Sequence, residues 1–302
     1  MAKPLAAIDI GTNTVRLLIA QPTGPTGLVR LADVSVTVRL GLGVDADGRL
    51  APERIDRAAA VVAELADRAR AAGATTVLAL ATSAVRDAAN RDDFLALARA
   101  RSGLLIEVID GAREAQLTFR GALLGRPIAG RQLVADVGGG STELILARDG
   151  AILTACSLQL GSGRLTERCL PGDPPSPAEV QAGRALAGAL LAGAPDGAVD
   201  EAILVGGTAS ALLRLTSRAA DDDRLTRAQL AAVLARVLAA PAAAVAAASG
   251  VDPERARVLP GGIIIVEAVM DRFGLDALSI SQGGIREGAV LEYLAAGGAE
   301  GE

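Results

Sequence analysis

Aspartate, glycine and hydroxyl side chains recur together at two places in this chain, each time between short apolar runs. The first copy reads AIDIGTNTVRLLI over residues 7–19, and the second reads ADVGGGSTELIL over residues 135–146. Equivalent residues are separated by a constant offset of 127, since 136 minus 9 is 127. A tight hairpin turn of small residues lets backbone N–H groups approach a phosphate, and an aspartate at its mouth suits hydrated Mg²⁺. We therefore expect two loops facing each other across one phosphate-handling cleft.

The small polar residues of the two loops are the predicted phosphate ligands, because hydroxyl, amide and backbone N–H groups donate hydrogen bonds to phosphate oxygens. They are Gly11, Thr12, Asn13 and Thr14 in the first loop, and Gly138, Gly139, Gly140, Ser141 and Thr142 in the second. Arg16 and Glu143 hold equivalent positions after the loops with opposite charge. This difference predicts electrostatic closure of the two sides around a charged substrate.

The composition limits the chemistry that the 302 residues can perform. Histidine is absent, which excludes His-activated nucleophiles and His-ligated zinc and leaves proton transfer to carboxylates. Lys3 is the only lysine, so a lysine-containing phosphate loop of the G-x-x-x-x-G-K-[ST] type is excluded too. Aromatic residues are 1% of the chain and the net charge is −5, which together argue against nucleic-acid binding.

The balance of 51% hydrophobic and 22% charged residues is typical of a compact soluble protein, with enough length for two domains. There is no run of 18 apolar residues, and the first residues lead directly into a predicted strand. We therefore expect a cytoplasmic protein without a signal peptide or a membrane span. An apolar, helix-rich second half is compatible with a homodimer.

Hydrophobic periodicity and Gly or Pro punctuation predict alternating strands and helices, and hence an α/β fold. Strands are expected at 5–10, 15–20, 29–40, 76–81, 105–109, 151–160, 201–205 and 277–281, with a second hairpin from 132. Helices are expected at 52–72, 91–101, 111–124, 178–192, 227–248, 255–272 and 284–294. The segment 81–87 is expected to be a loop. The second half repeats the strand order of the first, which indicates duplication of one fold unit.

Four motifs in the same order narrow the interpretation further: ATSAVRDA at 81–88, GAREA at 111–115, DVGGGSTE at 136–143 and GIREG at 284–288. Together with the first hairpin they resemble the exopolyphosphatase and guanosine pentaphosphate phosphohydrolase (Ppx/GppA) family, in its short two-domain form. The resemblance covers essentially the whole chain. It implies two ribonuclease H-like domains of the actin, Hsp70 and sugar-kinase superfamily, with an interdomain cleft. The expected domains are 1–121 plus the C-terminal helix 284–302, and 122–283.

The resemblance also implies roles for charged residues. It makes Glu114 the general base, which agrees with the need for a carboxylate in a chain without histidine. Glu143 would assist in ordering water or metal, and Asp9, Asp136 and Glu114 would hold Mg²⁺ or Mn²⁺. Arg86 and Arg286 match arginines of the phosphate channel, and Ser83 is a further phosphate donor. From the residues alone, Glu114 could instead stabilise a helix dipole, and either arginine could be an ordinary surface residue.

Gly206, Gly207 and Thr208 follow a predicted strand and open a helix. In the superfamily this turn contacts adenosine, which makes these residues candidates for nucleotide binding. A Gly-Gly turn between a strand and a helix is also common in packed cores, so the structural interpretation stays open.

The expected function is a Mg²⁺-dependent exopolyphosphatase that releases terminal orthophosphate from inorganic polyphosphate. The alternatives are a guanosine pentaphosphate phosphohydrolase, a kinase of the same superfamily, or an ATP-binding nucleotide switch. A kinase needs a catalytic aspartate away from the loops, and no candidate for it stands out. A switch would use slow hydrolysis to drive closure of its domains.

Overall fold

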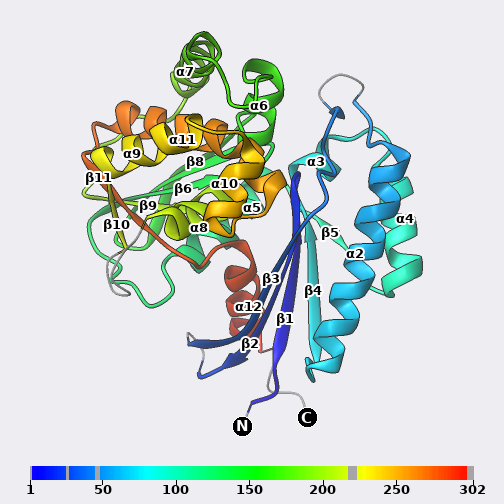
Figure 1. Ribbon diagram of the computed structural model, residues 1–302. Coiled ribbons are helices and arrows are strands. Elements are labelled where there is room, and N and C mark those ends of the chain that lie inside the picture. The colour runs from blue at the N-terminus through cyan, green and yellow to red at the C-terminus, as the bar shows by residue number, and fades with distance from the viewer. Residues whose placement is uncertain (1, 25–26, 45–47, 217–222, 298–302) are drawn as a thin grey trace. The chain divides into compact units, whose positions relative to one another are not determined.

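The computed structural model describes residues 2–24, 27–44, 48–216 and 223–297 (Figure 1). The chain separates into two compact units. Unit 1 comprises residues 1–127 and 283–302, and unit 2 comprises residues 128–282. The last five residues of the predicted segment 284–302 lie outside the described residues.

Unit 1 contains a five-stranded sheet in the order β3-β2-β1-β4-β5. Its first three strands form an antiparallel meander, and β4 and β5 then add in parallel. The strands are β1 (Leu5–Ile10), β2 (Thr14–Pro22), β3 (Leu28–Thr37), β4 (Thr76–Ala81) and β5 (Glu107–Val108). The expected strand at 105–109 is thus reduced to two residues, because Leu105 is largely exposed and has no core to enter.

Five helices are described in unit 1 and cover both faces of its sheet (Figure 1). They are α2 (Pro52–Ala71), α3 (Ser83–Asp87), α4 (Arg91–Ser102), α5 (Gly111–Ala122) and α12 (Ile285–Ala295). Pro52 opens α2 as predicted, since its missing N–H is not needed in the first turn. The prediction of a loop over 81–87 is wrong from residue 83 onward. There the chain forms α3, whose first residues are buried.

Helices α5 and α12 pack together very closely, because glycine lies at two of their contact points. A Cβ on Gly121 of α5 would collide with the backbone of Gly284, and a Cβ on Gly288 of α12 would collide with the carbonyl of Leu117. The two helices can approach to this distance only where no side chain separates them. The helices that carry the GAREA and GIREG motifs, which start 173 residues apart in the sequence since 284 minus 111 is 173, are thereby brought together.

Unit 2 contains a six-stranded sheet in the order β10-β11-β9-β6-β7-β8. Read from β8, it repeats the order of the first sheet, with an antiparallel meander followed by the parallel strands β9 and β11. The strands are β6 (Arg131–Val137), β7 (Thr142–Arg148), β8 (Ala151–Leu158), β9 (Glu201–Val205), β10 (Arg224–Thr226) and β11 (Ala277–Ile280). The predicted duplication of one fold unit is confirmed, and β10 is an addition to it.

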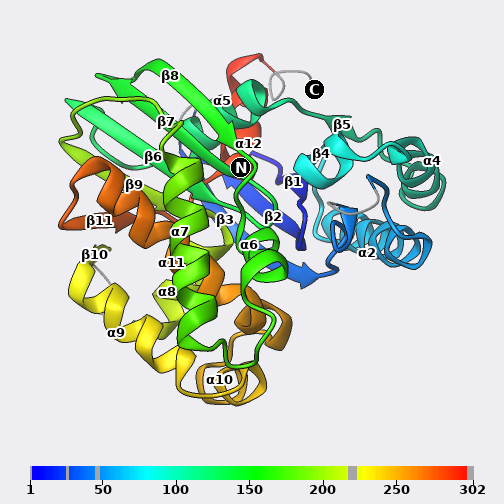
Figure 2. The same cartoon turned by 90° about the horizontal axis from the view of Figure 1, so that it is seen from above.

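The helices of unit 2 share one continuous hydrophobic core with its sheet. They are α6 (Ser162–Cys169), α7 (Pro177–Leu191), α8 (Gly206–Leu215), α9 (Arg227–Leu238), α10 (Ala242–Ser249) and α11 (Pro253–Phe273). The long helix α11 packs against α6, α7, α9 and α10 (Figure 2). The single helix predicted for 227–248 is two helices, because Pro241 cannot continue α9 and instead precedes α10. Helix α6 was not predicted.

Candidate active site

The first phosphate-type loop is the turn between β1 and β2. It is closed by a hydrogen bond of 3.0 Å from the backbone N–H of Gly11 to the carbonyl of Thr14. Its carbonyls point away from the tip, since the Asn13 carbonyl accepts from the N–H groups of residues 38 and 39 at 2.9 Å, and that of Thr12 accepts from Gly41 at 3.0 Å. The segment after β3 therefore holds this loop from behind.

The second loop, between β6 and β7, has the same construction. Gly138 N–H donates to the Ser141 carbonyl at 3.0 Å, which is the bond of the first loop moved by 127 residues. The first N–H groups of α6 supply the support here, with Ser162 donating to the Gly138 carbonyl and Gly163 to that of Gly139, both at 2.9 Å. Helix α6 therefore has a function that its sequence did not reveal, which is to hold the second loop.

A row of four side chains crosses the first sheet at the mouth of its loop. In register, Leu80, Asp9, Arg16 and Ser35 lie side by side on β4, β1, β2 and β3. Residues paired in this way across strands lie on one face of a sheet. Asp9 and Arg16 thus form a pair of opposite charge.

The second sheet has an equivalent row of Val205, Asp136, Glu143 and Ser157 on β9, β6, β7 and β8. Its central pair consists of two carboxylates, whereas the central pair of the first sheet consists of an aspartate and an arginine. Glu143 is only 1% exposed and accepts a hydrogen bond of 2.7 Å from the Ser157 hydroxyl. Ser157 was not predicted, although its place opposite Glu143 follows once the register of β7 and β8 is known.

Glu114 lies in the first turn of α5 and is 6% exposed. Arg86, on the short helix α3, donates from Nη1 to Glu114 Oε2 at 2.8 Å and to the carbonyl of Ile109 at 3.2 Å. The structure therefore joins two predicted site residues. The N-terminus of α5 is capped by Asp110, whose side chain accepts a hydrogen bond from the Arg113 N–H. Helix capping therefore does not explain why a glutamate is buried at position 114.

Ser83 lies against the first loop. Its hydroxyl and that of Thr12 are 2.8 Å apart and share a hydrogen bond. Ser83 is 2% exposed, since it begins α3 directly beneath the loop. Predicted residues from two distant segments, Thr12 of the first loop and Ser83 and Arg86 of α3, are thus grouped in unit 1.

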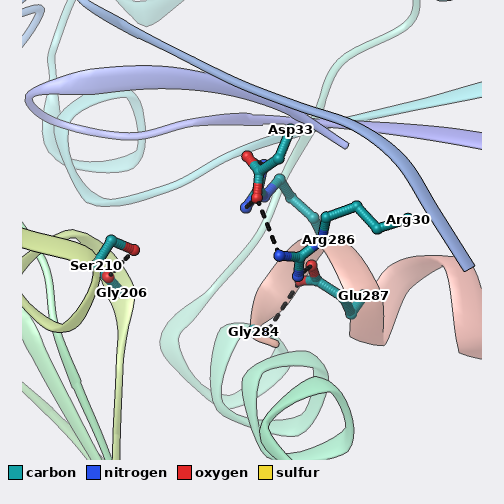
Figure 3. A network of polar contacts seen from close by, with 7 residues as sticks. All are labelled: Arg30, Asp33, Gly206, Ser210, Gly284, Arg286 and Glu287. Carbon is teal, nitrogen blue, oxygen red and sulfur yellow. Dashed lines mark hydrogen bonds and ion pairs between the residues drawn. The ribbon is translucent and has the colours of Figure 1, made fainter. Parts of the chain in front are cut away.

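Arg286, in the first turn of α12, lies in a network of charges near Asp9. It makes a two-point contact with Asp33 on β3, and its neighbour Glu287 accepts from Arg30 at 2.7 Å (Figure 3). Burial raises the pKa of Asp9, while the charges of Arg16 and Arg286 act to lower it. Asp33, Arg30 and Glu287 were not predicted. Glu287 directly follows Arg286 in the GIREG motif, but nothing in the sequence links the motif to β3.

The predicted nucleotide turn has a structural role within unit 2. Gly206 has a φ of +88° and begins α8, and a Cβ there would collide with the carboxylate of Asp136. The Thr208 hydroxyl donates to the Val137 carbonyl at 3.2 Å, and that of Ser210 donates back to Gly206 at 3.0 Å (Figure 3). These contacts show why residues 206–208 are small: they pack against the end of β6, the strand that carries Asp136. Nucleotide contact stays a prediction.

Carboxylates that could bind a cation differ between the units. Asp9 and Glu114 in unit 1 have arginines beside them, whereas Asp136 in unit 2 has Glu143 opposite it. Two neighbouring carboxylates repel each other, and a divalent cation relieves that repulsion. Among the residues that the structure describes there is no group of three or more acidic or cysteine side chains arranged to hold a metal. Asp136 and Glu143 supply oxygen atoms of the kind that Mg²⁺ prefers, and metal binding at this pair stays a prediction.

A family model described as the Ppx/GppA phosphatase family matches residues 19–296 of the chain. The chain belongs to the Ppx/GppA phosphatase family. Its similarity to individual family members extends over nearly its whole length. It is 38% identical to "Exopolyphosphatase 2" of Mycobacterium tuberculosis, over 95% of this chain and 97% of that protein. These matches confirm the expected family and the expectation of an enzyme that hydrolyses phosphoanhydride bonds.

Two solved structures share the fold of this Ppx/GppA chain. An exopolyphosphatase-like protein superposes with a TM-score of 0.86 at 30% identity, covering 97% of this chain and 98% of that one. An exopolyphosphatase from Cytophaga hutchinsonii superposes with a TM-score of 0.85 at 25% identity, with the same coverage. The predicted α/β fold is confirmed. None of the described helices of this family member is both long and apolar enough to span a bilayer.

Proposed function

We propose that this Ppx/GppA enzyme is an exopolyphosphatase, which releases terminal orthophosphate from inorganic polyphosphate. The duplicated loop carries the proposal, because each unit closes a hairpin of glycine and small polar residues with the same 3.0 Å hydrogen bond. Phosphate loops in duplicate suit a substrate made of repeated phosphates. The relatives named as exopolyphosphatases support this choice of substrate.

Glu114 is the proposed general base. It takes the proton from a water that attacks the terminal phosphorus in line, which a chain without histidine must assign to a carboxylate. The contact of 2.8 Å from Arg86 fixes the orientation of this carboxylate. A buried carboxylate held in one orientation is better placed to accept a proton than one on a mobile surface side chain.

Arg16 and Arg286 are the proposed phosphate-binding side chains of unit 1, together with the N–H groups and hydroxyls of residues 11–14 and Ser83. The N–H groups of residues 138–142 and the Ser141 hydroxyl would do the same in unit 2, whereas the Thr142 hydroxyl is buried and donates to the Leu160 carbonyl. An arginine guanidinium binds phosphate with several parallel hydrogen bonds, and buried donors are more effective than exposed ones. Their shared effect is to hold the phosphate chain while its charge redistributes toward the leaving oxygen.

Asp136 and Glu143 are the proposed holders of Mg²⁺ or Mn²⁺ in unit 2, and Asp9 and Glu114 stay predicted metal ligands within unit 1. When bound, the metal neutralises charge on the phosphate oxygens and lowers the pKa of coordinated water. Ser157 holds one oxygen of Glu143, which limits the rotation of this carboxylate. Second contacts of this kind orient metal ligands in many proteins.

The test is orthophosphate release by purified protein from long-chain polyphosphate, guanosine pentaphosphate and ATP, each offered separately with Mg²⁺. Release mainly from polyphosphate is expected, together with its loss in a chelator and its return with Mg²⁺ or Mn²⁺. Release confined to guanosine pentaphosphate would show that this nucleotide, and not polyphosphate, is the substrate. Transfer of phosphate to a sugar without release from polyphosphate of any length would refute the hydrolase.

A further inference from the structure

The contact between Arg286 and Asp33 joins residues 253 positions apart in the sequence. Arg286 Nη1 donates to Asp33 Oδ1 at 2.7 Å, and Nη2 donates to Oδ2 at 3.2 Å (Figure 3). Two parallel hydrogen bonds of this kind fix the plane of a guanidinium as well as its position. Arg286 is 5% exposed, whereas 35% of the Asp33 side chain is accessible.

The face of the sheet explains why Arg286 meets this aspartate. On β1 the residues facing α12 change from apolar Leu5 and Ala7 to charged Asp9 as the strand approaches the loop. Val290 of α12 packs on the apolar part of this face. Because Arg286 lies four residues before Val290, one turn closer to the loop, its side chain points at the charged part.

The network around Arg286 contains groups of both charges without any substrate. They include the carboxylates of Asp9, Asp33 and Glu287 and the guanidinium groups of Arg16, Arg30 and Arg286. A buried cation without a partner is very costly, and the contact with Asp33 offsets this cost for Arg286. The partner is thus supplied by the protein before a phosphate arrives.

The two contacts to Asp33 occupy only part of the guanidinium. An arginine carries five N–H donors, and two of them are used here. Within the part of the chain that the structure describes, this guanidinium donates hydrogen bonds to Asp33 alone. Three N–H groups with a fixed direction are therefore available for an anion.

We propose that Asp33 is a positioning residue, which presents the Arg286 guanidinium in one orientation beside Asp9 at the base of the first loop, ready for a phosphate group. The inference rests on the proposed function in that Arg286 contacts the phosphate chain. Asp33 itself contacts no substrate and acts only through Arg286. Without Asp33, the Arg286 side chain would be mobile, and its ordering at each binding event would cost conformational entropy.

The opposing interpretation is that Asp33 merely connects β3 to α12. Arg30 cannot serve as a control, because it lies 3.5 Å from Asp33 as well as 2.7 Å from Glu287. A better control is Tyr293 of α12, whose hydroxyl shares a hydrogen bond of 3.1 Å with that of Thr76 on β4 and so connects α12 to the same sheet without involving Asp33 or Arg286. Tyr293→Phe removes that connection and keeps the two-point contact. Asp33→Asn keeps the shape of Asp33 and removes its charge, and Asp33→Glu keeps the charge at a different reach.

The experiment measures KM, kcat and thermal stability for wild type, Asp33→Asn, Asp33→Glu and Tyr293→Phe with polyphosphate of defined length. We expect KM to rise by ~10-fold or more in Asp33→Asn, in line with the loss of a hydrogen bond to a charged group, and to recover partly in Asp33→Glu. Tyr293→Phe is expected to lose stability with KM within about 2-fold of wild type. Equal rises of KM in Asp33→Asn and Tyr293→Phe, or no rise in either, would overturn the positioning role.

Binding of tripolyphosphate to the Glu114→Gln background, measured by calorimetry, separates this inference from the proposed function. Weaker binding after Asp33→Asn in that background supports the positioning role, even if the wild-type protein proves not to hydrolyse polyphosphate. Unchanged binding contradicts it, even if hydrolysis is found.

Discussion

Arg86 and Glu114 form an ion pair of 2.8 Å between two buried or half-buried side chains that are 28 positions apart. One lies on a short helix directly after β4 and the other in the first turn of α5. The pair joins the proposed general base to an arginine of the expected phosphate channel. Loss of either side chain should therefore affect catalysis more than folding.

Glu114→Gln is expected to reduce turnover by at least ~100-fold while substrate binding is largely kept, because glutamine cannot accept the proton. The measurement is steady-state release of orthophosphate, with calorimetry for binding. Glu107→Gln is a matched control, since Glu107 is an exposed glutamate just before the same helix. Unchanged turnover in Glu114→Gln would transfer the role of base to Glu143.

Asp136→Asn is expected to raise the Mg²⁺ concentration needed for half-maximal activity by ~10-fold or more, since it removes one of two opposed carboxylates. Asp9→Asn should have a smaller effect on the metal requirement, because Asp9 has arginines beside it. Titration of activity with Mg²⁺ compares the two variants. A larger shift in Asp9→Asn than in Asp136→Asn would contradict the assignment of the metal to unit 2.

Gly121→Ala should lower the free energy of unfolding by ~1–3 kcal/mol, because the new methyl group meets backbone atoms that cannot rotate away. Gly188→Ala is the opposite case. Gly188 lies inside α7 with no atom within 4 Å of an added Cβ, so this change should stabilise by ~0.5–1 kcal/mol. Denaturant unfolding measures both, and similar effects in the two variants would show that the close contact of α5 and α12 is less strict than described.

The stability contributed by the contact between Arg131 and Asp200, where β6 and β9 begin, is expected to depend on pH. Hydrogen bonds from the Arg131 side chain and N–H lower the pKa of Asp200 to about 2. Because the folded value lies below the ordinary one, this contact contributes stability above the usual aspartate range and loses it as the pH falls toward about 2. Titration of the Asp200 carboxyl by NMR should find this low midpoint, and Arg131→Gln should raise it. A midpoint in the usual range in the unmutated protein would contradict the contact.

Local signals in the sequence were sufficient for much of the fold. The strands at 76–81 and 201–205 have the predicted bounds, because each is a short buried run bounded by turn residues. The predictions were wrong or incomplete where tertiary packing determines the secondary structure. Helix α6 depends on the carbonyls of the loop at Gly138 and Gly139, which no local pattern in residues 162–169 shows.

Site residues could be predicted where they belong to a short sequence motif. They could not be predicted where their partner comes from a strand that is distant in the sequence. The loops, Glu114 and Arg86 stood out by type and spacing. Asp33 lies in an ordinary alternating strand, and its contact with Arg286 depends on α12 returning to the first sheet after 253 residues of chain. Ser157 likewise required the register of β7 and β8.

The return of α12 to unit 1 has a consequence for biosynthesis. Unit 2 is one uninterrupted stretch, so its segments have all been translated when residue 282 leaves the ribosome. Unit 1 begins first and is completed last, because the face of β1 and β2 that Val290 covers stays open until α12 has been made. A nascent chain therefore has no Arg286 beside Asp9, and the proposed phosphate site of unit 1 is assembled only after nearly all of the described chain has been translated.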